Sequence, residues 1–308
     1  MESRTQMNIG ERTTARQPGA CADDETWFIS IYAGDTLFNL KPALVGNPVL
    51  SARDVSDADA VFVADPFMVN DGGAWHMFFE VLLAGSEKGE IGWAASDDGL
   101  AWSYQQIVLK EPFHLSYPYV FSVGDEYYMI PESTKSKAVR LYHAENFPDK
   151  WSFVGNILDG LWADPSVFFF KNRWWMFVCH ASPKNDGLAL FYADDIRGPW
   201  LRHSMNPLID GDNRIARPAG RVITDGDRLI RFAQDCNPAY GTSVRALEIS
   251  ELSLTSYREH QVQSDPILKG GGYWWNREGM HHVDPHRVGD KWLACVDGWR
   301  FGAGEHEA

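Results

Sequence analysis

The sequence predicts an all-β protein, a five-bladed β-propeller whose last blade is closed by strands from both termini. Helical periodicity is scarce, and short β-rich runs joined by turns with Gly, Asp or Asn recur along the chain. Five hairpins align on a proline, at Pro66, Pro118, Pro165, Pro218 and Pro285. A period of about fifty residues with several short strands per repeat is typical of propeller blades.

The expected elements follow one another in a regular order. The hairpins span residues 63–81, 116–133, 163–181, 216–235 and 283–299. Their prolines fall at the first residue of a strand, where the missing N–H costs the sheet no hydrogen bond. A second pair of strand-like runs follows each of the first four hairpins, over residues 90–109, 138–158, 188–209 and 244–268.

The fifth hairpin ends near Arg300 and leaves no room for its own outer strands. Residues 30–50 resemble residues 188–209, since IYAGD matches FYADD and NPVL matches NPLI. We therefore expect the start of the chain to supply the outer strands of the last blade. Closing the ring in this way removes an exposed sheet edge.

Length and composition exclude several classes of function. We expect residues 1–24 to be disordered, residues 25–302 to form a single domain and residues 303–308 to be a tail. The 308 residues contain 28 Lys and Arg against 42 Asp and Glu, a formal charge of −14, so nucleic acid is not an expected partner. No apolar run is long enough to insert into a membrane and no secretory signal is visible, so we predict a cytoplasmic protein. The oligomeric state is left open.

Neither a cofactor nor a metal is predicted. The four cysteines form no CxxC pair, and Cys236 is expected to be a small buried residue rather than a nucleophile. His281, His282 and His286 lack the spacing of a helical metal motif, although a cation on the propeller axis stays an alternative.

The innermost strands of a propeller line its axis, so their polar ends should meet at one mouth. The residues before the aligned prolines are Asp65, Tyr117, Asp164, Arg217 and Asp284. The returning strands end in Glu80, Glu132, His180, Gln234 with Asp235, and Asp297. A concave site with several carboxylates, an Arg and a His is the default candidate for ligand binding.

Structural roles are the alternative for each of these residues. Strand ends are polar wherever they meet at an axis, and Arg217 could neutralise the aspartates instead of binding a substrate carboxylate or phosphate. The repetition of Asp65, Asp164 and Asp284 favours function, because clustered carboxylates repel one another and raise one another's pKa.

Paired carboxylates are the groups that cleave glycosidic bonds, one as an acid and the other as a base or nucleophile. Aromatic faces stack on sugar rings, and most of the 13 Trp should instead pack within the blades. The segment 269–282, KGGGYWWNREGMHH, is expected to form a loop over the site, with Trp275 as a substrate contact.

At these residues the sequence resembles known families. Asp65 in ADPF and Asp164 in ADPS resemble the blade-start aspartates of family 43 glycoside hydrolases. The motifs FVADPFM, SYPYVF, YYMIPES, ARPAGRV and RFAQDCNPAYG more specifically resemble the N-terminal propeller domain of glucosamine inositolphosphorylceramide transferases and its bacterial stand-alone relatives, over about residues 27–299. The family 43 resemblance implies a general base at Asp65 and a residue that tunes the acid's pKa at Asp164.

The fourth blade departs from the family 43 pattern. Its general acid is a Glu at the start of that blade, where this chain has Arg217 in ARPAG. Glu132 is then the first candidate for the acid, with Glu80 and Glu278 in reserve; otherwise the hydrolase chemistry is absent. The nucleotide-sugar chemistry of the transferases is expected in a separate domain.

We therefore predict a carbohydrate-active enzyme that cleaves or rearranges a glycosidic linkage of a small-molecule or oligosaccharide substrate. Its catalytic residues would be Asp65, Glu132 and Asp164. The expected substrate-binding residues are Glu80, Tyr117, His180, Arg217, Gln234, Asp235, Trp275, His282 and Asp284. The alternatives are a non-catalytic module that binds a glycan or sugar phosphate, and a biosynthetic enzyme that uses the same funnel on a non-sugar substrate.

Overall fold

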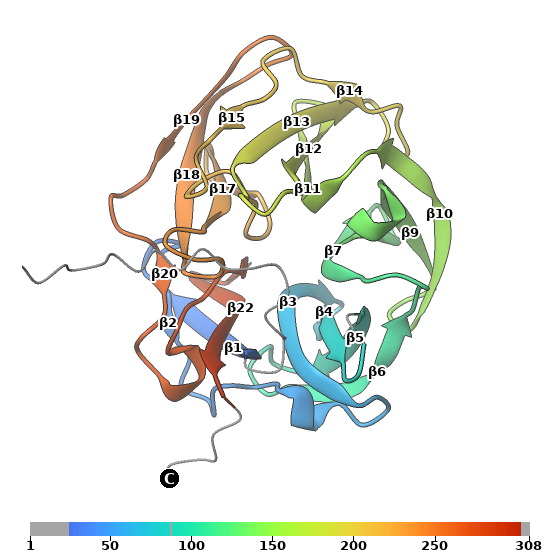
Figure 1. The fold of residues 1–308 in the computed structure, drawn as a ribbon, viewed down its shortest axis with the longest axis vertical. Coiled ribbons are helices and arrows are strands. Elements are labelled where there is room, and N and C mark those ends of the chain that lie inside the picture. Colours follow the sequence, from blue (N-terminus) through green and yellow to red (C-terminus); the bar gives the residue numbers. More distant parts are fainter. Residues whose placement is uncertain (1–24, 87, 303–308) are drawn as a thin grey trace, which may run out of the picture.

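The computed structural model describes residues 25–86 and 88–302, so the predictions for residues 1–24 and 303–308 fall outside the described residues. Five antiparallel sheets surround a common axis, which confirms the predicted five-bladed propeller (Figure 1). The helices among the described residues are single 3₁₀ turns, η2 (Ala52–Asp54), η3 (Thr134–Ser136) and η4 (Trp274–Asn276), and none of them could span a bilayer.

The blades are numbered in chain order, and strands are given from the axis outward. Blade one contains β3 (Ala60–Asp71), β4 (Ala74–Leu83), β5 (Gly89–Ser96) and β6 (Ser103–Leu109). Blade two contains β7 (Ser116–Val123), β8 (Glu126–Glu132), β9 (Ala138–Asn146) and β10 (Lys150–Asp159). Blade three contains β11 (Trp162–Phe170), β12 (Arg173–His180) and β13 (Gly187–Ala193), with β14 (Leu201–Arg202) and β15 (Ile209–Asp210) outside. Blade four contains β16 (Ile223–Asp225), β17 (Arg228–Asp235) and β18 (Ser243–Leu252), with β19 (Tyr257–Gln261) and β20 (Leu268–Lys269) outside.

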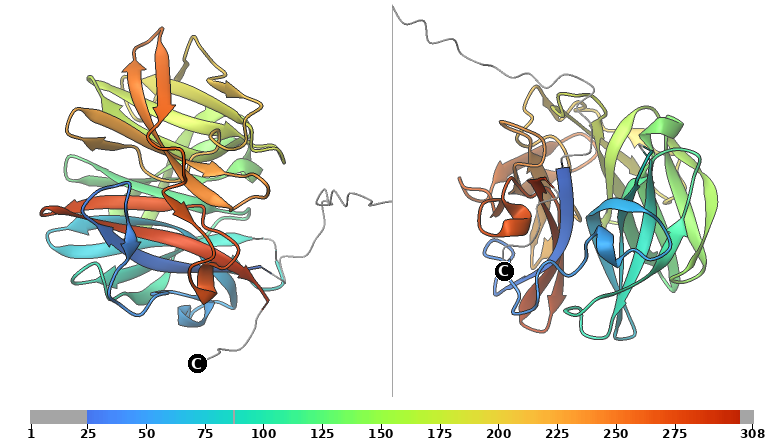
Figure 2. Two further views of the ribbon diagram at one scale, coloured as in Figure 1. Left: turned by 90° about the vertical axis from the view of Figure 1, so that its left-hand side faces the viewer. Right: turned by 60° about the horizontal axis from the view of Figure 1, so that its bottom comes forward.

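Blade five joins the two ends of the described chain. Its inner strands are β21 (Val283–Val288) and β22 (Lys291–Phe301), and its outer strands are β1 (Glu25–Gly34) and β2 (Lys41–Pro42). Strand β1 pairs with β22 along its whole length, from Glu25 opposite Phe301 to Gly34 opposite Trp292, and Figure 2 shows the two strands side by side. The predicted closure of the ring is therefore confirmed.

The hydrophobic core lies between neighbouring blades. Phe67 and Phe78 of blade one pack in one cluster with Tyr119 of blade two and Val167 of blade three. A second cluster joins blades four and five, a third joins blades five and one, and a fourth joins blades three and four. Each blade thus buries apolar area against both neighbours, and the last blade must be complete before the first is fully covered.

The inner strands of blades one, two and three contain a β-bulge at equivalent positions. The antiparallel register shifts there, and one residue other than glycine takes a left-handed backbone. Its φ is 54° at Asp65, 44° at Tyr117 and 51° at Asp164. Bulges re-aim side chains, and this conformation is strained for a residue with a Cβ, so the fold holds these three positions against a local cost.

Each bulge residue lies six positions before the last residue of its inner strand. In blade five the same position, counted from Val288, is His282. Asp284, which the alignment on proline places beside Asp65, lies two residues further along the strand.

In blade four the residue before the aligned proline is displaced in the opposite direction. Six positions before Asp225, where β16 ends, is Ala219. Arg217 lies two residues earlier, ahead of the strand. The proline alignment therefore marks equivalent residues in blades one to three and slips by two residues in blades four and five.

We predict that Ile31→Ala lowers the free energy of unfolding by about 2–5 kcal/mol, because Ile31 is fully buried in β1 opposite β22. Urea denaturation measures the change. Leu44→Ala is the control, since this side chain is fully exposed and its loss should cost no more than about 0.5 kcal/mol. Equal stabilities of Ile31→Ala and the wild type would contradict a structural role for the closing strand.

Candidate active site

Five carboxyl groups from four blades gather at the mouth, the end of the axis where the inner strands begin. They belong to Asp65, Glu80, Glu132, Asp164 and Asp297, and all but Glu132 are buried. Glu132 keeps 15% of its side chain exposed and the nearby Arg217 keeps 16%, so solvent reaches the cluster at these two groups.

Arg217 neutralises one side of this cluster. Its guanidinium donates two hydrogen bonds to Asp164, with Nε 2.6 Å from Oδ2 and Nη2 3.2 Å from Oδ1, and it lies 3.4 Å from Glu132. Gln234 donates a further hydrogen bond to Asp164 over 2.8 Å. Burial alone would raise the pKa of Asp164, but Arg217 more than offsets it and holds that pKa below its ordinary value.

His281 compensates negative charge on the other side of the carboxyl cluster. Its Nδ1 lies 2.8 Å from Asp297 and its Nε2 lies 3.6 Å from Asp65. Asp297 also accepts a hydrogen bond from the backbone N–H of Asp65 over 3.0 Å. Burial opposes ionisation of both partners, yet their attraction raises the pKa of His281 and lowers the pKa of Asp297. They form a buried ion pair beside Asp65.

The same three residues are the candidate cation site among the described residues. One ligand atom from each of Asp65, His281 and Asp297 lies within 4.8 Å of the others. These atoms already bond one another, so a cation would have to displace the contacts of His281. The grouping differs from the HHVDPH motif, because His282 and His286 are not part of it.

Three carboxyl groups are left without full compensation. Burial raises the pKa of Asp65 to about 7, although His281 opposes the shift. Burial and the charge of Asp164 raise the pKa of Glu132 to about 8, with Arg217 in partial opposition. Burial and the charge of Asp65 raise the pKa of Glu80 well above its ordinary value. Near neutral pH the cluster therefore combines protonated and ionised carboxyl groups.

Tyr117 and His282 lie beneath the cluster and are fully buried. The Tyr117 hydroxyl accepts a hydrogen bond from the backbone N–H of Gly220 over 2.6 Å and lies 2.8 Å from Ser166, so it ties three blades together. His282 packs edge-on against Phe67 and Tyr117, and neither ring nitrogen hydrogen-bonds to a described residue. Burial lowers the pKa of His282 to about 4, so this imidazole is neutral.

Asp284 does not join the cluster, in contrast to the expectation. It is fully buried and accepts hydrogen bonds from Arg221 over 2.8 Å and from the backbone N–H of Met68 over 2.7 Å. It therefore links blades four, five and one further along the axis. The reason is the two-residue slip of the proline alignment in blade five, which puts His282 at the mouth position.

Trp275 and Asp235 also occupy structural positions. Trp275, expected in a loop over the site, is 1% exposed and belongs to the core cluster between blades four and five. Its neighbours Tyr273 and Trp274 are the exposed aromatics of that segment. Asp235 forms an ion pair of 2.7 Å with Arg245 of the next strand.

His180 and Glu278 stand apart from the cluster as well. The His180 ring is exposed at the end of β12 and lines a separate pocket with Trp162. Glu278 is exposed, and its backbone N–H bonds to Trp299. Of the reserve acids, only Glu80 lies among the clustered carboxyl groups.

Three residues at the cluster, Asn185, Tyr240 and His281, are not among the catalytic or substrate-binding residues predicted from the sequence. Asn185 accepts a hydrogen bond of 2.9 Å from Arg217, and the Tyr240 ring lies 4.9 Å from the Arg217 guanidinium carbon. His281 precedes His282, so counting from the hairpin turn would have placed it near the mouth. Asn185 lies in a loop and carries no sequence signal of its contact.

Comparison with known proteins places this geometry in a family. Residues 20–299 match the family model described as glucosamine inositolphosphorylceramide transferase 1, N-terminal. The chain belongs to this family. The rice transferase of this name (Oryza sativa subsp. japonica) is 33% identical over 315 residues, which cover 94% of this chain and 42% of the relative. The Arabidopsis thaliana transferase is 32% identical over 310 residues, which cover 92% of this chain and 40% of the relative.

The propeller of this transferase family shares its fold with glycoside hydrolases. A putative glycoside hydrolase from Parabacteroides distasonis has a TM-score of 0.62 at 11% identity, covering 84% of this chain and 95% of the other. The catalytic domain of the Coprinopsis cinerea family 62 α-L-arabinofuranosidase has a TM-score of 0.58 at 14% identity, covering 76% and 90%. At such identities the likeness shows the fold alone. The chain spans about two-fifths of the length of the transferases it matches.

We predict that Glu132→Gln makes stability less sensitive to pH. In the folded protein the pKa of Glu132 rises from 4.5 to about 8, so between these values the folded state keeps a proton that the unfolded state releases. Raising the pH across that window therefore destabilises the wild type, and the carboxamide removes this contribution, which is on the order of a few kcal/mol. Thermal unfolding at pH values between 4.5 and 8 measures the difference.

The matched control is Glu278→Gln, which changes an exposed glutamate outside the cluster. Its stability should follow the wild type at each pH. If Glu132→Gln also followed the wild type, the carboxyl group would not be protonated in the folded protein.

Proposed function

We propose that this propeller acts on a glycosidic linkage of a saccharide by acid–base chemistry at the mouth. One observation supports the proposal most strongly, namely that the environments of three neighbouring carboxyl groups push their pKa values apart. Arg217 keeps Asp164 ionised, while burial raises the pKa of Asp65 to about 7 and that of Glu132 to about 8. Such separation is how enzymes run acid and base steps at one pH.

The roles follow from these differences. Asp65 is the general base, because its pKa near neutrality lets it accept a proton from water or from an acceptor hydroxyl. Glu132 is the general acid, because it holds a proton at neutral pH and lies with Arg217 where solvent reaches the cluster. Asp164 is a positioning residue that holds Arg217 close to Glu132.

Hydrolysis and transfer differ here only in what Asp65 deprotonates. When water loses the proton, the anomeric carbon takes a hydroxyl and the linkage is hydrolysed. When a hydroxyl of a second molecule loses it, the sugar passes to that molecule. The name of the relatives favours transfer, and the shared fold of the hydrolases favours cleavage.

A second candidate is a non-catalytic module that binds a glycan or sugar phosphate. It is favoured by Arg217, which stands where the family 43 resemblance implies the acid and which is bonded to Asp164. A module of this kind would bind saccharides saturably in calorimetry and lose that binding in Arg217→Ala, without turnover of any glycoside.

A panel of nitrophenyl glycofuranosides and glycopyranosides separates the two candidates. On any substrate that is turned over, we expect Asp65→Asn to lower kcat/KM by about 10²–10⁴-fold, because the amide cannot accept the proton. Asp265→Asn, at an exposed aspartate of blade four, should keep the wild-type rate. A rate of Asp65→Asn within a few-fold of wild type would reject Asp65 as the base.

We also expect a bell-shaped pH profile of kcat/KM on such a substrate. Activity should fall below pH of about 7 as Asp65 gains a proton, and above about 8 as Glu132 loses one. In Glu132→Gln, measured with a nitrophenolate leaving group that needs little protonation, the alkaline limb should disappear while the acid limb stays. An alkaline limb that persists in this variant would assign the acid to another group, with Glu80 next.

A further inference from the structure

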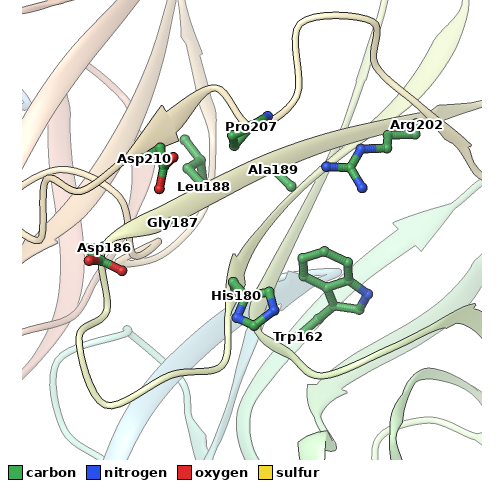
Figure 3. A pocket seen from close by; sticks show the side chains of 9 residues that line it. All are labelled: Trp162, His180, Asp186, Gly187, Leu188, Ala189, Arg202, Pro207 and Asp210. Carbon is green, nitrogen blue, oxygen red and sulfur yellow. The ribbon is translucent and has the colours of Figure 1, made fainter.

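A pocket of about 290 Å³ lies beside the mouth, outside the carboxyl cluster. It lies at the end of blade three and is lined by polar side chains of β12, β14, β15 and the loop before β13, with one aromatic ring at the start of β11 (Figure 3). Its size is at the lower end of ligand pockets, about 300–1,000 Å³, and suits a single sugar ring better than a longer chain.

Four polar side chains line the pocket, and three of them, His180, Arg202 and Asp210, are exposed. His180, Asp186, Arg202 and Asp210 make no side-chain hydrogen bond or ion pair with any other described residue. Other charges of the same blade and the following loop are paired, such as Arg173 with Asp194 and Arg214 with Asp212. Unpaired donors and acceptors that line one concavity suit a ligand with several hydroxyl groups.

Trp162 supplies the aromatic face of the pocket, and Leu188, Ala189 and Pro207 add to its apolar lining. Trp162 is half-buried and lies edge-on to His180, with ring centroids 5.7 Å apart. Its indole N–H donates to the carbonyl of Asp159 over 3.0 Å, and a Cβ on Gly160 would approach the indole to 2.4 Å. The ring is therefore fixed before any ligand arrives, which lowers the entropy cost of binding.

Thr134 and Asn185 link residues of the pocket to residues of the carboxyl cluster. The Thr134 hydroxyl lies 2.7 Å from the carbonyl of Trp162 and 3.3 Å from Glu132. Asn185, next to Asp186 in the loop, accepts a hydrogen bond from Arg217. A ligand longer than one ring could thus contact both places.

We propose that this pocket binds one sugar ring, neutral or positively charged, of a saccharide whose reacting ring lies at the carboxyl cluster. Trp162 contacts the apolar face of the ring, while Arg202 donates to its hydroxyls and Asp186 and Asp210 accept from them. With two carboxylates against one guanidinium, the pocket disfavours an anionic ring. The inference rests on the proposed function in taking a saccharide as the ligand and in placing its reacting ring at the carboxyl cluster.

The test follows the indole N–H signals of the ¹⁵N-labelled full chain by NMR, with the Trp162 signal identified by its loss in Trp162→Phe. Three probes are titrated separately: methyl β-glucopyranoside, its 2-amino analogue and methyl β-glucuronide. We expect saturable shifts of the Trp162 signal with dissociation constants on the order of millimolar, the amino sugar binding best and the glucuronide worst. Arg202→Ala should weaken binding of the neutral glycoside about tenfold or more.

Matched controls come from the same fold. Phe169→Ala removes an exposed aromatic near the other end of β11, and Arg258→Ala removes an exposed arginine of blade four. Both should bind like the wild type. No shift of Trp162 with any probe at about 100 mM, equal weakening by Arg258→Ala, or tightest binding of the glucuronide would each overturn the assignment.

Asp65→Asn separates this inference from the proposed function. Turnover should be lost in that variant while the Trp162 shifts persist, because the pocket lies outside the carboxyl cluster. Shifts of Trp162 without turnover of any glycoside would support the pocket and count against the enzyme. Loss of the shifts in Asp65→Asn would overturn the pocket as a separate site.

Discussion

The propeller mouth depends on how two cations, Arg217 and His281, compensate five clustered carboxyl groups, four of them buried. A carboxylate out of water is costly unless it is paired and hydrogen-bonded. Arg217 stabilises Asp164 as an anion, and His281 does so for Asp297. For Asp65, Glu80 and Glu132, burial and mutual repulsion outweigh the nearby positive charge, so their pKa values rise. The uneven distribution of positive charge, rather than the number of acids, creates groups that can exchange protons near neutral pH.

Backbone geometry also helps to assemble the carboxyl cluster. Three equivalent residues hold a left-handed backbone within a bulge, and two of them, Asp65 and Asp164, carry carboxyl groups of the cluster. The third, Tyr117, directs its hydroxyl to Ser166 and Gly220 instead. Interlocked blades can hold such strained positions because each is packed from both sides, and strain of this kind concentrates at functional sites.

Membership in the transferase family follows from sequence similarity, whereas the likeness to hydrolases concerns the fold alone. The fold supplies a ring of strand ends, and many chemistries can use it. The chain's own arrangement, with Arg217 bonded to Asp164 ahead of blade four, sets it apart from the family 43 pattern that its first and third blades resemble. The pocket at Trp162 and His180 extends this arrangement outward along blade three.

The sequence by itself determined the architecture. Repeated hairpins predict the blades, and the match of residues 30–50 with residues 188–209 predicts the strands that close the ring, because both are patterns within short segments of the chain. It also placed Asp65 and Asp164 at equivalent starts of inner strands. Only the tertiary structure decided that His282 replaces Asp284 at the mouth and that Trp275 is core. Register is set by the distance from the hairpin turn and by the bulge, which a proline does not reveal. The partners of Arg217 lie in other blades, so their contacts exist only once the ring has closed.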